Sequence, residues 1–156
     1  MSLRAAGCPS VAPLGGLVRE VVWSTGATWS RWDVHIHTPD TLQNNQFKGD
    51  WPGFLAAVEA QPEVRALGIT DYFGLRGYER VSRERSSGRL SNIEFVFPNL
   101  EFRISPPTER KSLPINIHLL VCPDDPDHVQ QLRDALSRLW VVVREQPYAC
   151  TESQLV

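Results

Sequence analysis

The sequence has few cysteines and no long apolar run. Its three cysteines, Cys8, Cys122 and Cys150, are far apart, and none belongs to a Cys-x-x-Cys pair. An odd number of widely spaced thiols argues against a disulfide framework and against a thiolate zinc site. No run approaches the roughly 20 apolar residues of a membrane span, and no apolar stretch typical of an export signal precedes Cys8. We therefore expect a cytoplasmic protein without a membrane partner.

The sequence also lacks an excess of charge of one sign. Its 16 basic and 18 acidic residues give a formal net charge of -2. This balance does not indicate binding to nucleic acid or to an anionic membrane, although one local site could still bind phosphate. A length of 156 residues, 42% of them hydrophobic, suits one domain or part of a larger one. Residues 1–28 are rich in glycine, proline, serine and alanine, and we expect a poorly structured leader there, followed by a domain over 29–156.

The apolar pattern predicts alternating strands and helices. Strand-like runs are rich in β-branched and aromatic residues, whereas the helical segments repeat apolar residues every three or four positions. The predicted order is a strand over 31–37, a helix over 54–61, a strand over 64–70, a helix over 75–86, a strand-like run over 93–104 interrupted at Pro98-Asn99, a strand over 115–122 and a helix over 126–139. Such alternation favours an α/β fold with largely parallel strands, in which functional residues gather at the carboxyl ends of the strands.

His35 and His37 are the first candidates for chemistry. They lie two positions apart on a predicted strand, so both rings point to the same face. Both also lie close to the end of that strand, before the break at Thr38-Pro39. Two neutral imidazoles on one face can hold a metal ion. The alternative is a pair of histidines packed or hydrogen-bonded inside the fold, but a His-x-His at a strand end favours a ligand pair.

Three further residues are weaker candidates when each is taken alone. Asp71 follows an apolar strand and suits a metal ligand, a general base or a helix cap. Glu101 lies among apolar neighbours, where a carboxylate needs a partner or a metal, unless it faces water. His118 lies inside a predicted strand and is as well explained by a satisfied buried histidine as by a ligand. His128, the fourth histidine, is expected to be exposed in the first turn of a helix.

Together these residues predict a metal site more strongly than any of them does alone. Three of the four histidines fall at the ends or centres of predicted strands. Imidazoles and carboxylates without a thiolate pair suit Zn²⁺, Mn²⁺ or Fe²⁺. Such an ion can lower the pKa of bound water and hold a phosphoryl oxygen.

Four motifs resemble those of the PHP (polymerase and histidinol phosphatase) family, and they occur in the family's order. They are Asp33-Val34-His35-Ile36-His37-Thr38, Gly68-Ile69-Thr70-Asp71-Tyr72, Pro98-Asn99-Leu100-Glu101 and His118. The chain resembles most the PHP domain at the N-terminus of large SMC-like ATPases, because Arg31 to Pro39, Asn44-Asn45 and Ile69 to Phe73 fit the pattern of those domains.

The resemblance implies a partial (β/α)7 barrel, a distorted TIM-like barrel with two or three divalent metal ions. It implies that His35, His37, Glu101 and His118 are metal ligands and that Asp71 is a catalytic position. The implied activity is hydrolysis of a phosphoester of a nucleotide, a nucleic acid or a small molecule. The chain would be the incomplete N-terminal part of a larger protein whose ATPase region is a partner.

The sequence departs from the family pattern in three ways. The family often has a carboxylate or a histidine a few residues after the His-x-His, and here Asp40 is close to that position but offset. Tyr72 stands where the family has a histidine, and no histidine follows His128, so the late family ligands have no counterpart. These departures leave open a PHP-like structural or regulatory module without activity. A third possibility is an α/β binding protein whose histidines have no metal-binding role. The occurrence of four motifs in the family's order argues against it.

Overall fold

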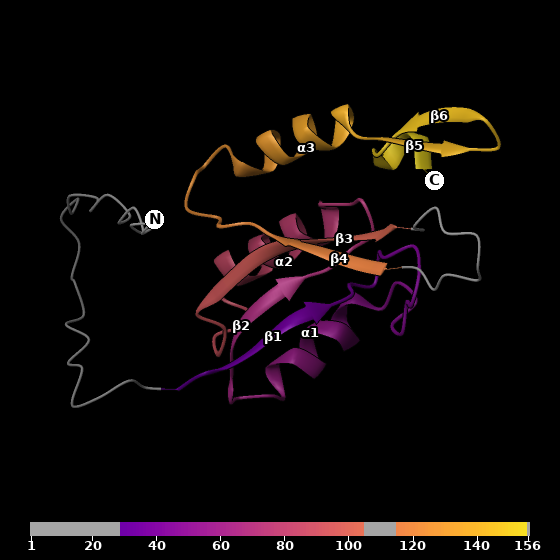
Figure 1. Ribbon diagram of the computed structural model, residues 1–156. Coiled ribbons are helices and arrows are strands. Elements are labelled where there is room, and N and C mark those ends of the chain that lie inside the picture. Colours follow the sequence, from indigo (N-terminus) through magenta and orange to yellow (C-terminus); the bar gives the residue numbers. More distant parts are fainter. Residues whose placement is uncertain (1–28, 105–114, 156) are drawn as a thin grey trace.

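The computed structural model describes residues 29–104 and 115–155. The elements are, in chain order, β1 (Arg31–Ile36), α1 (Trp51–Glu59), β2 (Val64–Ile69), α2 (Arg76–Ser86), β3 (Phe95–Ile104), β4 (Ile115–Leu120), α3 (His128–Arg138), β5 (Trp140–Val143), β6 (Gln146–Ala149) and the short α4 (Glu152–Leu155) (Figure 1). The predicted order of elements is confirmed as far as α3. The expected leader, 1–28, lies outside the described residues.

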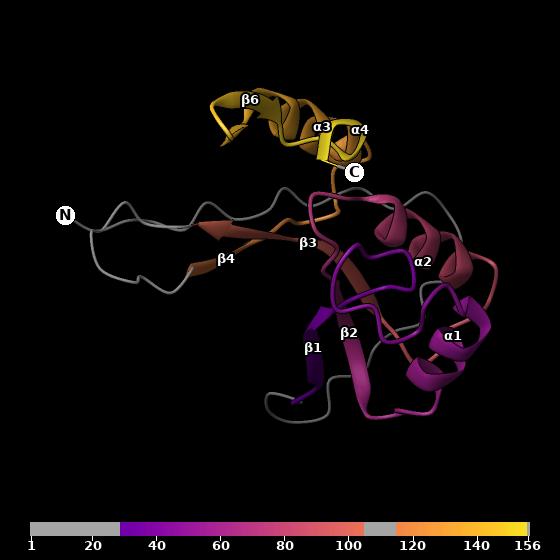
Figure 2. The same ribbon diagram turned by 90° about the vertical axis from the view of Figure 1, so that its right-hand side faces the viewer.

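Four strands form one mixed sheet in the order β1-β2-β3-β4. β1 pairs parallel with β2, and β2 pairs parallel with β3, whereas β3 and β4 are antiparallel. The helices α1 and α2 connect the three parallel strands and lie on the same side of the sheet (Figure 2). Parallel crossovers are normally right-handed, and two successive crossovers in the same direction along a sheet then place both helices on one face.

The predicted (β/α)7 barrel is wrong for the described part of the chain. A barrel of that type needs parallel strands joined by helices, but β3 turns back into the antiparallel β4. Only ten residues, 105–114, join these two strands, and a parallel connection needs a dozen or more. The sheet does not close, because β1 and β4 are its two ends, and β5 and β6 form a separate two-stranded sheet.

β3 is one strand, although the sequence predicts a break at Pro98-Asn99. Up to Pro98 the strand pairs with β2, and from Asn99 onward it pairs with β4. The proline, which lacks an N–H donor, stands where the strand changes partner, and its carbonyl accepts a hydrogen bond of 3.1 Å from the Val121 amide. A proline is therefore tolerated here and does not end the strand.

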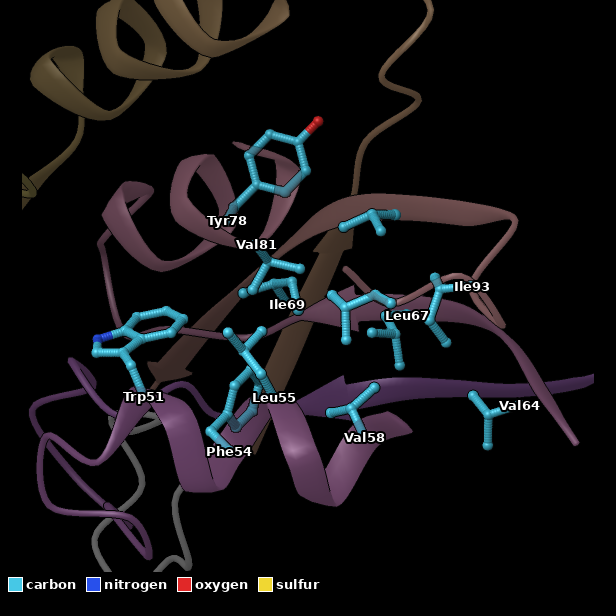
Figure 3. Packing of buried hydrophobic residues seen from close by; sticks show 12 residues of the cluster. Trp51, Phe54, Leu55, Val58, Val64, Leu67, Ile69, Tyr78, Val81 and Ile93 are labelled. Atoms are coloured by element: carbon cyan, nitrogen blue, oxygen red, sulfur yellow. The ribbon is translucent and has the colours of Figure 1, made fainter. Parts of the chain in front are cut away.

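The main core lies between the sheet and the two helices. The buried residues of α1 are Trp51, Phe54, Leu55 and Val58, one stripe at helical spacing. They pack with Leu67 and Ile69 of β2, Val96 of β3, and Tyr78 and Val81 of α2 (Figure 3). Because Val96 faces the helices, the alternate β3 residues at 95, 97, 99, 101 and 103 face the opposite side of the sheet.

A second apolar cluster packs α3 against β3 and the residue before α2. Leu132 and Leu136 pack with Leu75, Leu100 and Cys150. His128 is not exposed as predicted, since it is half-buried and its Nε2 lies 2.8 Å from the Tyr78 hydroxyl. No helix among the described residues is both long enough and apolar enough to cross a membrane.

An ion pair between Glu59 of α1 and Arg89 adds stability that depends on pH. Two hydrogen bonds of 2.7 and 2.8 Å join the side chains, and the Leu90 amide donates a third to Glu59. The Arg89 and Leu90 bonds lower the pKa of Glu59 from 4.5 to about 2. The folded pKa lies below the unfolded value, so this stabilisation is present above pH 4.5 and is lost as pH falls toward 2.

We expect Glu59→Gln to lower the free energy of unfolding by about 1 kcal/mol at pH 7, because the pair is partly exposed. The difference from wild type should shrink at pH 3. Urea unfolding at both pH values measures it, with Glu63→Gln as the control, since that variant breaks the exposed pair with Arg31. A difference that is equal at both pH values would contradict the linkage.

Candidate metal centre

His35, His37 and Glu101 come together beside the carboxyl end of β1. The Nε2 atoms of the two histidines are 3.2 Å apart. The Glu101 Oε2 atom lies 3.4 Å from Nε2 of His35 and 3.8 Å from Nε2 of His37. One donor atom from each residue lies within 4.8 Å of the others, an arrangement that can hold a metal ion.

The sheet register explains how Glu101 meets His37 and His35, which precede it by 64 and 66 positions in the chain. Glu101 pairs with His118 across the β3–β4 ladder, and it also bridges to Tyr72, which follows β2. Glu101 lies on the face of the sheet that the helices do not cover. Both histidines reach this face from β1 and the residue just after it, so the parallel strands bring their carboxyl ends to one place.

The donor set has the features of a cation site. Glu101 is only 1% exposed. Its Oε2 atom and the Nδ1 atom of His37 are buried and have no hydrogen-bond partner. A buried carboxylate oxygen without a partner costs free energy. A divalent cation would bind this oxygen together with the two facing imidazole nitrogens, so the residues present fit a metal ion.

His118 lies at the edge of this group and outside the three-residue cluster. Its ring centroid is 4.7 Å from that of His35. Its Nδ1 is 3.1 Å from Oδ1 of Asn99, and the amide of Asn99 donates a 2.6 Å bond to the Val34 carbonyl. The side-chain nitrogen of Asn99 is therefore the donor to β1, so its side-chain oxygen Oδ1 must accept a hydrogen bond from the Nδ1–H of His118. That leaves the lone pair of His118 on Nε2, the form that a metal ligand requires.

We expect His118→Ala to weaken metal binding by about tenfold, because loss of a peripheral or orienting group costs 10–100-fold. His35→Ala alone should cost more, since its Nε2 lies within the cluster. Titration calorimetry with Mn²⁺ compares the two variants. A larger loss in His118→Ala would show that the primary ligand set includes His118 in place of His35.

Asp71, the predicted catalytic position, is not one of the three residues of the cluster. Its carboxylate accepts hydrogen bonds from the amide and the hydroxyl of Thr38, at 3.0 and 2.7 Å. Asp71 is buried, and a Cβ atom on Gly77 would overlap both Asp71 and Thr38. The structure therefore gives Asp71 a positioning task, since it fixes the turn that follows His37.

Tyr72 lies beside the cluster in the place of the expected histidine. Its ring stacks on His37 at 5.4 Å between centroids. Its hydroxyl accepts hydrogen bonds from Asn44 and Arg103 at 3.2 and 3.3 Å. Burial, followed by the negative charge of Glu101, raises the pKa of Tyr72 above its ordinary value. The hydroxyl thus stays neutral, and a neutral phenol is a poor metal ligand.

Sequence reasoning missed Arg103 and named Asn99 only as part of a motif and of an expected strand break. Both alternate with Glu101 along β3, so strand periodicity places them on the same face once Glu101 is taken as a site residue. Thr38 and Tyr72 were noted only as part of the motifs, and their hydrogen bonds could not be predicted from spacing.

Comparison with known proteins adds no assignment. No family model, curated protein or solved structure matches the chain. The candidate centre is therefore supported by its own geometry.

Proposed function

We propose that the chain binds a divalent cation through His35, His37 and Glu101 and that this centre hydrolyses a phosphoester. The observation that carries the proposal is the meeting of two imidazole nitrogens and a buried carboxylate oxygen without a hydrogen-bond partner. Three donors in the described part of the chain suit one ion of Zn²⁺, Mn²⁺ or Fe²⁺. The two or three ions implied by the PHP resemblance would need further ligands.

A bound ion would supply a water molecule of lowered pKa and polarise a phosphoryl oxygen. The residues of the chain would hold the ion and leave room for the substrate beside it. His35 is 44% exposed at its side chain, so one side of the cluster is open to a substrate, whereas Glu101 is sealed against water. Thr38 and Asp71 fix the turn beside His37, and Tyr72 packs on the His37 ring. These contacts hold the ligand atoms together before binding, which lowers the entropic cost of assembling the site.

A second candidate is a PHP-like module that binds metal without hydrolysing a substrate. Two observations favour it: Tyr72 replaces the expected histidine, and the Asp71 carboxylate binds Thr38. The resemblance leads us to propose an ATPase region as the partner of such a module, and the cysteine usage leads us to propose a cytoplasmic setting.

The experiment that separates these functions is metal analysis combined with hydrolysis of p-nitrophenyl phosphate and its bis-ester by the full chain, with and without Mn²⁺ or Zn²⁺. The control is the double variant His35→Ala/His37→Ala. The phosphoesterase proposal expects metal-dependent release of nitrophenol that the double variant lacks. Equal rates in both proteins would overturn it, and metal binding without hydrolysis would favour the second candidate.

A further inference from the structure

Arg103 lies beside the candidate centre but is not one of the residues proposed to bind the metal ion. It lies two residues after Glu101 on β3, on the same face of the sheet. Its Nη2 atom is 4.0 Å from Oε1 of Glu101, the oxygen on the side away from the histidine contacts. Its side chain is 44% exposed, so the guanidinium is close to the centre and still open to solvent.

The guanidinium is held in place by neutral groups. Nε donates to Oδ1 of Asn116 at 3.2 Å, and Nη2 donates to the Tyr72 hydroxyl at 3.3 Å. Neither acceptor carries charge. Glu101 forms a long ion pair of 4.0 Å with Arg103 through Oε1, and it directs its other oxygen toward the two histidines. Nη1 has no hydrogen-bond partner among the described residues. Arg103 is thus oriented and charged, and it keeps N–H donors that no side chain or carbonyl in 29–104 or 115–155 uses.

Such a guanidinium suits an oxyanion. Arginine binds phosphate through two parallel N–H donors, with a strength about twice that of a neutral hydrogen bond. A divalent ion and Arg103, set against Glu101, leave two net positive charges at the centre. A phosphomonoester carries nearly two negative charges at neutral pH, whereas a diester carries one. The charge of the centre therefore matches the monoester.

We propose that Arg103 binds the phosphate group of a phosphomonoester at the centre formed by His35, His37 and Glu101. The inference rests on the proposed function and narrows its substrate to esters with a terminal phosphate. Tyr72 and Asn116 are positioning residues in this arrangement, because they fix the guanidinium and do not contact the phosphate.

The test measures phosphate and metal binding separately by titration calorimetry on the full chain. Inorganic phosphate and dimethyl phosphate are the anion probes, and Mn²⁺ is the metal probe. The variants are Arg103→Met and Arg103→Lys. Arg133→Met is the matched control, since Arg133 is similarly exposed, at 47%, and pairs with Glu79 away from the centre. Tyr72→Phe removes one contact of Arg103 and keeps its charge.

We expect Arg103→Met to bind phosphate about 10–100-fold more weakly than wild type, as for loss of a charge-assisted hydrogen-bond pair. Arg103→Lys should have an intermediate phosphate affinity, because the lysine ammonium keeps the charge but lacks the two parallel N–H donors of a guanidinium. Mn²⁺ affinity should not fall in either variant, because Arg103 is not a metal ligand in this arrangement and its positive charge, 4.0 Å from Glu101, opposes a bound cation. Wild type should prefer phosphate to dimethyl phosphate, and Arg103→Met should lose most of this preference.

Several outcomes would overturn the inference. Unchanged phosphate affinity in Arg103→Met would do so and would leave the metal proposal standing. So would an equal loss in Tyr72→Phe, or a parallel loss of Mn²⁺ binding in Arg103→Met, since either would indicate a structural role. If wild type binds no metal ion, the proposed function fails. Phosphate binding that still depends on Arg103 would then support the anion site, and its absence would reject it.

Discussion

Replacing both His35 and His37 with alanine is expected to weaken binding of Mn²⁺ or Zn²⁺ by more than about 100-fold. Loss of groups that merely orient a ligand already costs 10–100-fold, and the two histidines supply two of the three clustered donor atoms. Titration calorimetry at fixed pH measures the affinity. A hydrolysis assay with p-nitrophenyl phosphate should show the same loss.

His128→Ala is the control for this prediction. His128 is half-buried, as His37 is, and it contacts Tyr78 on α2, far along the chain from the cluster. It should leave metal affinity unchanged. If His128→Ala reduces the affinity as strongly as the double variant, histidine loss acts through general destabilisation and the cluster is not the binding site.

Glu101→Gln separates metal binding from folding. The substitution keeps the shape of the side chain and removes a carboxylate that is 1% exposed and has one oxygen without a hydrogen-bond partner. The metal-free variant should therefore be at least as stable as metal-free wild type. At a metal concentration of about 100 times the dissociation constant, a site of this kind stabilises a protein by about 2.7 kcal/mol. Wild type should gain about 5–10 °C in Tm, and the variant should gain none.

Differential scanning fluorimetry with and without Mn²⁺ measures this difference. Glu79→Gln, which breaks the pair with Arg133 on the surface, should retain the full metal-dependent gain. A Glu101→Gln protein that still gains stability from Mn²⁺ would place the ion elsewhere. A variant that unfolds without metal would instead assign Glu101 a structural role.

The local features of the fold follow from the sequence. The helical stripe of Phe54, Leu55 and Val58 predicts α1, and the run from Val64 to Ile69 predicts β2. The spacing of His35 and His37 predicts that both rings share a face, because strand side chains alternate. These features depend on backbone periodicity over a few residues, so the sequence alone determines them.

The sequence was misleading where pairing between distant segments decides the outcome. Alternation of strands and helices predicted a parallel barrel, but the ten residues between β3 and β4 allow only an antiparallel return. Pro98 was expected to end a strand, but it stands where β3 changes partner and no N–H donor is needed. His128 was expected to be exposed, yet α2 lies close enough for its hydrogen bond to Tyr78.

The candidate centre divides in the same way. Residue type and spacing in the sequence made the His-x-His pair a metal-binding candidate, whereas Glu101 and His118 were weak candidates alone and became expected ligands through the PHP resemblance. Only the tertiary structure decided that His35, His37 and Glu101 form the cluster. It also decided that His118 lies at the edge of this cluster with its ring oriented by Asn99, and that Asp71 accepts a hydrogen bond from Thr38. The physical reason is that residue type fixes what a side chain can donate or accept, whereas the register of the strands fixes which atoms meet.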